Sequence, residues 1–531
     1  MKEPWNIPQI WKWVEIKSLG DIVSGGTPST KEMSYWGDDI NWISPADLTG
    51  YTKKTIARGA KSLTHQGLAK SSAKLMPAGS IHFSSRAPIG YVAISSQPLS
   101  TNQGFKSLVP AQGVFNEYVY YYLKAAKYIA EERASGTTFR EISGTAFGKL
   151  PFPLPSLPEQ NQIVAKIEEL FSELDNGIEN LKKARGQLKT YRQAVLKYAF
   201  EGRFSKEWRT RQIQAGNPPE PAENLLERIR KESEKHYKKQ VEDWEKACEL
   251  ANKEGKKKPA RPKRPKELPP LTDTELKELP ELPRKWEWCK LGDLSYLITK
   301  GASPKWQGFK YVTDPTQVLF ITSENIRNNY IDIDNPKYLE NAFSLKQRNS
   351  VLQNGDILLN IVGASIGRAA IYALELSANI NQAVSLIRLA DQNLKEFISI
   401  FLNTSSANKF YNSKKVDFAR ANLSLADVSN IPIPLCSKME INFIVSEIES
   451  RLSVCDKIEQ TIEDSFKKAE ALRQSILKKA FEGELTREWR KKHPELIFGE
   501  NSAEKLLERI KAEKALATGR EKSRSKKMKK E

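Results

Sequence analysis

The chain has 531 residues, a formal net charge of +19 and a mean hydropathy of −0.55. This length exceeds one ordinary core and predicts two to four domains. No apolar run approaches the roughly 18 residues of a membrane helix, and the first residues lack the apolar segment of a signal peptide. We therefore expect a soluble cytoplasmic protein, and the excess of basic residues predicts a polyanionic partner such as nucleic acid.

The chemistry-bearing residues are scattered. The four cysteines and four histidines form neither a C-x-x-C nor an H-x-x-x-H motif, so we predict no disulfide and no metal site. Asn217-Pro218-Pro219 matches the first three residues of the four-residue loop of adenine methyltransferases, but Glu220 stands where that loop needs an aromatic residue. A turn between two helices is the better interpretation. We identify no catalytic residues.

The chain contains an internal duplication at an offset of 281 residues. This offset holds over about eighty residues: Leu150-Pro151-Phe152-Pro153-Leu154 returns as Ile431-Pro432-Ile433-Pro434-Leu435, and Ala199-Phe200-Glu201-Gly202 as Ala480-Phe481-Glu482-Gly483. The segments before these match more loosely. The duplicated unit is therefore one variable module followed by one constant module.

Each constant module is predicted to begin with a long helix. Ser156 and Glu159, like Ser437 and Glu440, have the spacing of a capping box, and Gly202 and Gly483 are predicted to end the helices. Apolar residues recur every seven positions, which is typical of a coiled coil. We expect the two helices to pair with each other through Ile167, Leu174, Leu181, Leu188, Val195, Ile448, Ile462 and Ile476.

The variable modules combine short β-rich runs with helical stretches, which predicts α+β domains. The expected strands are 40–43, 91–94, 319–322 and 357–362, and the expected helices are 117–133 and 394–411. Gly, Pro, Ser and Asn separate them and mark turns.

Charge is unevenly distributed within the first variable module. Residues 48–116 contain eight basic residues and no Asp or Glu. A solvated basic face is one interpretation, and contact with phosphates is the one we favour, because Lys and Arg displace condensed counterions. The candidate DNA-binding residues are Lys53, Lys54, Arg58, Lys61, Lys70, Lys74, Arg86, Asn102 and Gln103 in the first module, and Lys305, Lys310, Arg327, Arg348, Arg368 and Arg420 in the second.

The order of these elements resembles the specificity subunits of type I restriction-modification systems. The similarity rests on the repeated proline-rich segment and helix, the repeated Ala-Phe-Glu-Gly, and the repeated Glu-Trp-Arg of 207–209 and 488–490. Gly25-Gly26-Thr27-Pro28-Ser29 and Asn102-Gln103-Gly104 add to it. The second copy departs from the pattern at 437–440, where Ser-Lys-Met-Glu replaces the proline-containing first turn.

The resemblance implies an α+β fold with two globular target-recognition domains in pseudo-twofold tandem repeat, separated by two long helices that pair as an antiparallel coiled coil. Each domain would recognise one half of a bipartite site on double-stranded DNA, and the helices would set the gap and dock two modification subunits, through which restriction subunits join. This chain would bind no cofactor, since S-adenosylmethionine, ATP and Mg²⁺ would belong to the partner subunits. The cell would be bacterial or archaeal, and no membrane is involved.

The expected boundaries follow the duplication. They are target-recognition domain 1 at 1–150, helical region 1 at 151–252, a basic proline-rich linker at 253–282, target-recognition domain 2 at 283–430, helical region 2 at 431–510 and a basic tail at 511–531. Two alternatives stay open: a DNA-binding coiled-coil scaffold without sequence preference, and a stand-alone DNA methyltransferase, which the missing catalytic motifs disfavour.

Overall fold

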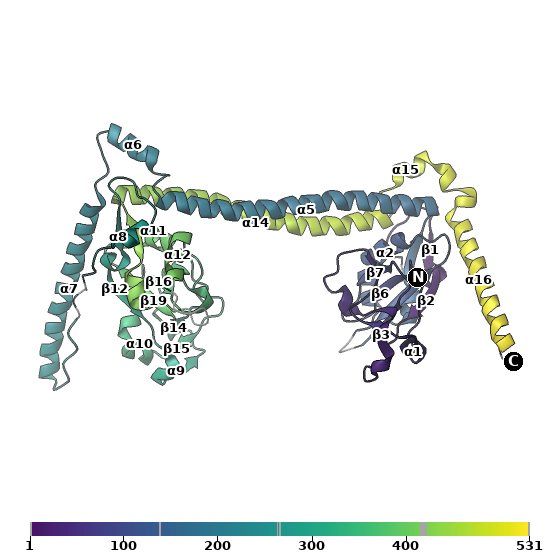
Figure 1. The fold of residues 1–531 in the computed structure, drawn as a ribbon, viewed down its shortest axis with the longest axis horizontal. Coiled ribbons are helices and arrows are strands. Elements are labelled where there is room, and N and C mark those ends of the chain that lie inside the picture. Colours follow the sequence, from purple (N-terminus) through teal and green to yellow (C-terminus); the bar gives the residue numbers. More distant parts are fainter. Residues whose placement is uncertain (1–2, 137–139, 263, 265–266, 415–421, 529–531) are drawn as a thin grey trace. The chain divides into compact units, whose positions relative to one another are not determined.

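The chain folds into two compact units in a computed structural model that describes residues 3–136, 140–262, 264, 267–414 and 422–528, with side chains described as far as 516. Unit 1 contains 1–183 and 462–531, and unit 2 contains 184–461. The ribbon is shown in Figure 1. The units do not follow the duplication, because each contains one variable module and one half of each long helix.

The variable module of unit 1 is built on two sheets. The larger has the strand order β2-β9-β6-β7-β4, and the smaller has β5-β3-β8 with β3 parallel to β8. The strands are β2 (Gly20–Ser24), β3 (Trp36–Ile43), β4 (Thr55–Ile56), β5 (Ser62–Leu63), β6 (Ile81–Ser84), β7 (Val92–Ser95), β8 (Ser100–Thr101) and β9 (Phe105–Pro110). The helices are η1 (Ile16–Ser18), η2 (Met33–Tyr35), η3 (Pro45–Leu48), α1 (His65–Ala69), α2 (Asn116–Ala125), α3 (Lys127–Glu132) and α4 (Gly144–Gly148).

The variable module of unit 2 has a related topology with four strands in each sheet. Its sheets have the orders β12-β19-β16-β17 and β13-β15-β14-β18, with β14 parallel to β18. The strands are β12 (Ser295–Lys300), β13 (Tyr311–Val312), β14 (Val318–Ile321), β15 (Tyr338–Leu339), β16 (Ile357–Asn360), β17 (Ala369–Ile371), β18 (Ala378–Ile380) and β19 (Val384–Leu389). The helices are η4 (Leu291–Leu294), α9 (Pro304–Gln307), α10 (Ala342–Lys346), η5 (Arg348–Ser350), η6 (Gly363–Ser365), η7 (Gln392–Leu394), α11 (Lys395–Leu402), α12 (Ser405–Ser413) and α13 (Leu425–Ser429).

The mixed composition of both modules was predicted, but their longest helices are shorter than expected. The stretch 117–133 divides into α2 and α3 at Ala126, whose backbone leaves the helical conformation. The stretch 394–411 divides into α11 and α12, because the Thr404 hydroxyl accepts a hydrogen bond from the amide of Ala407 and caps a new helix. Apolar periodicity alone does not reveal such breaks.

Each module is closed by a two-stranded sheet that joins it to the constant region. β1 (Lys12–Glu15) pairs antiparallel with β10 (Pro151–Leu154), and β11 (Glu287–Lys290) pairs with β20 (Pro432–Leu435). The repeated proline-rich motif is therefore a strand. Its alternate prolines are tolerated because, in a two-stranded sheet, every second amide points away from the partner strand.

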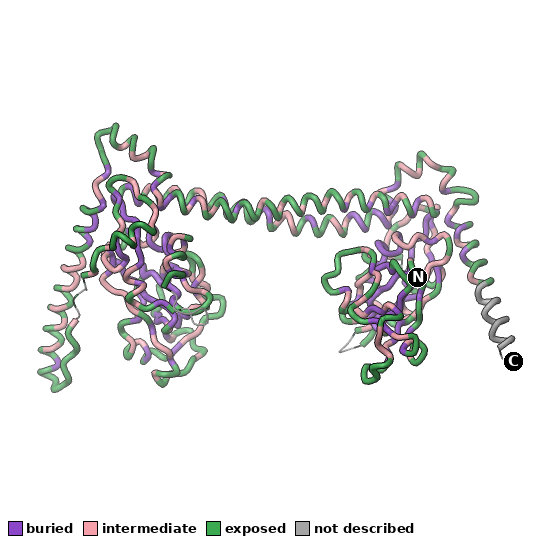
Figure 2. The backbone as a smooth tube through the Cα atoms, in the orientation of Figure 1, coloured by how far each residue is buried: buried purple, intermediate pink, exposed green. Residues whose placement is uncertain are grey.

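The predicted long helices are α5 (Leu157–Phe200) and α14 (Lys438–Phe481), each of 44 residues. Of the positions predicted to pair, Ile167, Leu188, Val195, Ile448, Ile462 and Ile476 are buried, whereas Leu174 and Leu181 are half-buried. Buried residues gather in the sheets of each module, whereas the long helices are mostly intermediate or exposed along their middle parts (Figure 2).

The two helices run antiparallel inside each unit, because the start of one helix, at Glu159 or Glu440, contacts the segment just after the other, at Thr486 or Arg209, and an ion pair follows further along. In unit 1, Arg473 of α14 pairs with Asp175 of α5. In unit 2, Arg192 of α5 pairs with Asp456 of α14 at 2.7 Å. Asp456 and Arg473 are the repeat equivalents of Asp175 and Arg192, so the two pairs are copies of one contact.

One continuous core in each unit joins the variable module to both long helices. In unit 1, Phe481 of α14 packs against Tyr118 of α2, with ring centroids 5.3 Å apart, and against Tyr122 at 5.4 Å. In unit 2, Phe200 of α5 packs against Phe401 of α11 at 5.1 Å. The repeated Ala-Phe-Glu-Gly motif thus carries the aromatic residue that attaches each helix to a module. Gly202 and Gly483, with φ of +66° and +73°, end the helices as predicted.

The remaining helices follow the long ones. They are α6 (Lys206–Gln214), α7 (Ala222–Lys253) and α8 (Asp273–Lys277) in unit 2, and α15 (Arg487–Lys492), η8 (Pro494–Leu496), η9 (Gly499–Asn501) and α16 (Ala503–Met528) in unit 1. The basic linker contacts α7, where the indole of Trp244 donates to the carbonyl of Pro259 at 2.8 Å and stacks under Arg261 at 5.6 Å.

Candidate nucleic-acid interface

The acid-free stretch of the first module presents a set of exposed cations. Lys53, Arg58, Lys61, Lys70 and Lys74 are all exposed, and among the described residues no carboxylate lies within ion-pair distance of them. Lys61 lies over the Trp36 ring at 5.4 Å. Cations without a carboxylate partner are free to contact phosphates.

Lys54 is placed differently from its neighbours. Its ammonium group lies 2.7 Å from Glu117 of α2 and 2.5 Å from Glu168 of α5. Partial burial disfavours the charged form, but the hydrogen bonds to these two carboxylates outweigh it and raise the pKa of Lys54. This lysine joins the module to the long helix, so its ammonium is already engaged.

Arg86 lies beside a buried cation and a shared carboxylate. Glu141 is 3.1 Å from the buried Lys106 and 3.4 Å from Arg86, which is partly exposed. Burial acts to raise the pKa of Glu141, yet the hydrogen bond and charge of Lys106 lower it overall. Glu141 therefore stays ionised and holds Arg86 at the surface.

Asn102 and Gln103 belong to a loop that ties two sequence motifs together. The Asn102 side chain donates to the Thr27 hydroxyl at 2.7 Å and accepts from the Gly104 amide at 2.6 Å. The Thr27 hydroxyl in turn donates to Gln103, which is exposed. Asn102 therefore fixes the loop, and Gln103 is the member of the pair that faces solvent.

The candidate DNA-binding residues of the second module also include both exposed cations and a cation that is already paired within the protein. Lys305, Lys310 and Arg348 are exposed, and Arg368 is half-buried. Arg327 is engaged within its own turn, where it pairs with Asp332 at 3.0 Å and donates to the carbonyl of Glu324 at 2.7 Å. Arg420 lies outside the described residues.

A buried carboxylate clasp lies at the start of each long helix, and the spacing of the capping residues did not predict it. The Ser156 and Ser437 hydroxyls accept from the amides of Glu159 and Glu440, as predicted. The two glutamates do not complete a capping box, because their carboxylates bind distant residues. These partners are Trp11 at 2.8 Å, Thr486 at 2.8 Å and Arg490 at 2.6 Å for Glu159, and Arg209 at 2.5 Å for Glu440.

The clasp gives the repeated Glu-Trp-Arg motif a role. Arg209 and Arg490 are repeat equivalents, and each arginine also lies over a tryptophan near the start of a module, Trp286 at 5.9 Å or Trp11 at 5.7 Å. Each arginine thus connects the start of a module to the helix that follows that module, within one unit.

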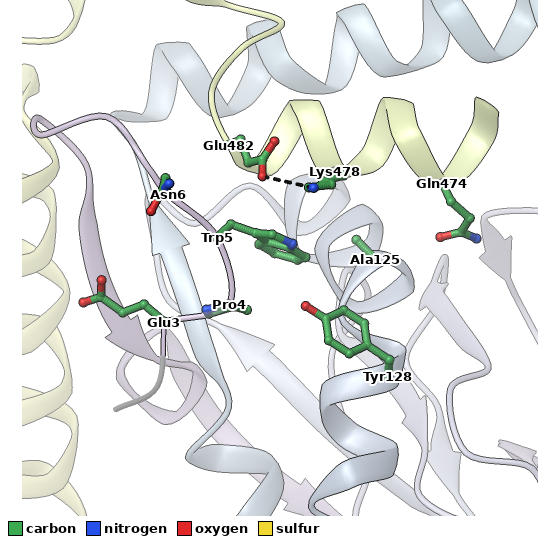
Figure 3. A pocket seen from close by; sticks show the side chains of 9 residues that line it. All are labelled: Glu3, Pro4, Trp5, Asn6, Ala125, Tyr128, Gln474, Lys478 and Glu482. Carbon is green, nitrogen blue, oxygen red and sulfur yellow. Dashed lines mark ion pairs between the residues drawn. The ribbon is translucent and has the colours of Figure 1, made fainter. Parts of the chain in front are cut away.

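A pocket of about 500 Å³ lies in unit 1 where the N-terminal segment crosses the end of α14 (Figure 3). Trp5 stacks on Phe481 beside it at 6.0 Å, and Lys478 and Glu482 form an ion pair across its rim at 3.8 Å. These two charges neutralise each other. We interpret the pocket as a packing gap at the joint between module and helix.

The chemistry-bearing side chains stay apart in the structure. Within the described ranges, no group of three or more His, Cys, Asp or Glu could hold a metal ion. Burial lowers the pKa of His82 to about 3 and raises the pKa values of the Cys289 and Cys436 thiols. Asn217-Pro218-Pro219 lies in the connection between α6 and α7, as predicted. No described helix is long and apolar enough to cross a membrane.

Taken together, the fold defines a chain that carries two copies of one α+β module, each attached to a pair of long helices. Residues 8–183 and 283–468 match the family model described as the type I restriction modification DNA specificity domain. The chain therefore belongs to this family, with two tandem copies of the domain.

Individual relatives agree with this assignment. The chain is 42% identical over 181 residues to the type I restriction enzyme MjaIX specificity subunit of Methanocaldococcus jannaschii, a match that spans 34% of this chain and 41% of that protein. It is 25% identical over 539 residues to the type I restriction enzyme EcoKI specificity subunit of Escherichia coli K12, covering 98% of this chain and 99% of that protein.

The fold is similar to that of a chain solved in a study of complex assembly and conformational transition of the type I R-M system. The TM-score is 0.57 at 16% identity, and the match covers 91% of this chain and 100% of that one.

Proposed function

We propose that this chain is the DNA-recognition subunit of a type I restriction-modification complex, in which each module recognises one half of a bipartite site. The observation that carries the proposal is the pair of equivalent modules in a DNA specificity family, each with exposed cations that no described carboxylate neutralises. Phosphate contacts by these cations position the modules, and base contacts provide the specificity.

The paired helices α5 and α14 supply the constant part of this function. We assign to them the spacing between the two half-sites and the docking of modification subunits. An apolar groove of about 760 Å³ lies between the two helices in unit 1 and suits an apolar partner surface. It is lined in part by Leu170, Leu174, Leu181, Leu472, Ile476 and Leu485.

The chemistry belongs, in this proposal, to the partners. Modification subunits would carry S-adenosylmethionine and transfer the methyl group to adenine, and restriction subunits would carry ATP and Mg²⁺. This chain would determine only where on the DNA those subunits act.

Reconstitution with labelled S-adenosylmethionine tests this division of labour. The purified chain mixed with DNA should transfer no methyl group above background, and the same chain with the modification subunit of its own system should methylate adenines in one gapped motif. Methyl transfer by the chain alone would favour a stand-alone methyltransferase. Methylation by the complex without a common motif would favour a scaffold that binds DNA without sequence preference.

A further inference from the structure

The two most exposed large apolar side chains of the described residues lie in equivalent connections of the two modules, each on a short helical turn after the first strand of a sheet. Trp306 is 88% exposed and Met33 is 78% exposed. Trp306 lies on α9, between β12 and β13, and Met33 lies on η2, between β2 and β3. β2 and β12 are equivalent strands, since each is an edge strand of its sheet and pairs with an equivalent strand, β9 or β19.

The turn that carries Trp306 is anchored on both sides. Pro304 is buried, and Gly308 ends the turn with φ of +84°. Phe309 packs against Phe343 with ring centroids 5.4 Å apart. Lys346 donates to the carbonyl of Gln307 at 3.0 Å. The indole is therefore presented to solvent by a fixed backbone, and its exposure does not come from a loose loop.

The surroundings of Trp306 are basic. Residues 300–313 contain three lysines and no Asp or Glu. Two of these lysines, Lys305 and Lys310, are exposed on either side of the indole in sequence. An apolar side chain that projects between free cations is complementary to DNA, where phosphates flank the nonpolar surfaces of the bases.

The turn that carries Met33 has one lysine and one acidic neighbour. Lys31 precedes it, and the carboxylate of the intervening Glu32 accepts from the Ser34 amide at 3.3 Å and from its hydroxyl at 2.7 Å. The hydrogen bonds from Ser34 lower the pKa of Glu32, whose charge is held by its own turn. Met and Trp share little except apolar bulk, so the common property of the two turns is a projecting nonpolar contact.

We propose that Trp306 and Met33 are apolar DNA contacts of the two recognition modules, seated against nonpolar base surfaces while the neighbouring lysines hold phosphates. This inference rests on the proposed function. Two surfaces offer the required chemistry: the thymine methyl group in the major groove, and the face of a base at a partly unstacked step.

The proposal is tested by measuring how tightly the complex of this chain with modification subunits binds a DNA duplex that carries the motif the complex methylates. W306A should weaken binding about tenfold, as loss of one base-pair contact does, without changing the salt dependence. K310A should instead reduce the slope of log K against log salt by about 0.9. W306F should keep most of the affinity, and M33A should act on the first half-motif as W306A does on the second.

Leu376→Ala is the matched control. Leu376 is 50% exposed in the same module but lies in the connection between β17 and β18, not in the turn after β12, so its loss should leave binding unchanged. Binding of W306A equal to that of the wild-type complex would overturn the inference. If the wild-type complex itself showed no preference for the motif, the proposed function would fail first, so the two failures are distinguishable.

Modified duplexes distinguish the two base surfaces. Loss of affinity when deoxyuridine replaces thymidine in the half-site, present in the wild type and absent in W306A, identifies the methyl group. A rise in 2-aminopurine fluorescence that depends on Trp306 identifies an unstacked base. If neither signal appears and the affinity does not depend on Trp306, the proposal is contradicted.

Discussion

Replacing Arg490 by methionine should lower the free energy of unfolding by about 3 kcal/mol, because it leaves the buried charge of Glu159 without its cation. Glu159 is fully buried, and its Oε1 lies 2.6 Å from Arg490. The remaining donors, Trp11 and Thr486, are neutral and cannot replace the positive charge. A urea titration of the full chain measures the change.

Two further variants identify the cause of this loss. R211M removes an exposed arginine that pairs with Glu207 on the surface, and should change the stability little. In E159Q/R490M the uncompensated charge is gone, so the double variant should be more stable than R490M alone. An R490M effect no larger than that of R211M would contradict the role of the clasp.

Exchanging the variable part of the first module for that of another family member should change one half of the methylated motif and leave the other half unaltered. The exchange should run from Ile16 to Lys149, because β1 and β10 and the Trp11 side of the clasp then stay native. Only one half of the motif should change because each module has its own sheets and its own exposed cations. Sequencing of methylated adenines gives the result.

The same exchange in the second module, from Leu291 to Ile431, is the matched control and should change the opposite half. The first exchange removes Lys54, which pairs with Glu168 on α5. The incoming module should therefore be chosen so that it has a basic residue at this position. A change in both halves after a single exchange would contradict independent recognition by the two modules.

The features that the sequence predicted well are those encoded locally. The heptad spacing predicted two long helices, and the glycines at 202 and 483 predicted where they end. The repeat offset predicted two equivalent modules. The helix signals depend on residues within a few turns of one another, and the offset is visible because the two copies of the constant module kept the same length.

The features that were missed depend on contacts between distant segments. Glu159 has the spacing of a capping residue, yet its carboxylate binds Arg490, 331 residues away. The acid-free stretch identified the cations of the first module. However, Lys54 pairs with Glu117 and Arg86 pairs with Glu141, and both carboxylates lie outside that stretch, so its composition does not reveal these pairs. Trp306 was overlooked because an isolated tryptophan in a sequence is more often buried.

Mapping methylated adenines in cells with and without this gene tests the central claim most directly. If the chain directs methylation, one gapped motif should be methylated in the parent strain and unmethylated in the deletion strain, and a plasmid copy of the gene should restore it. An unchanged set of methylated motifs in the deletion strain would contradict the claim.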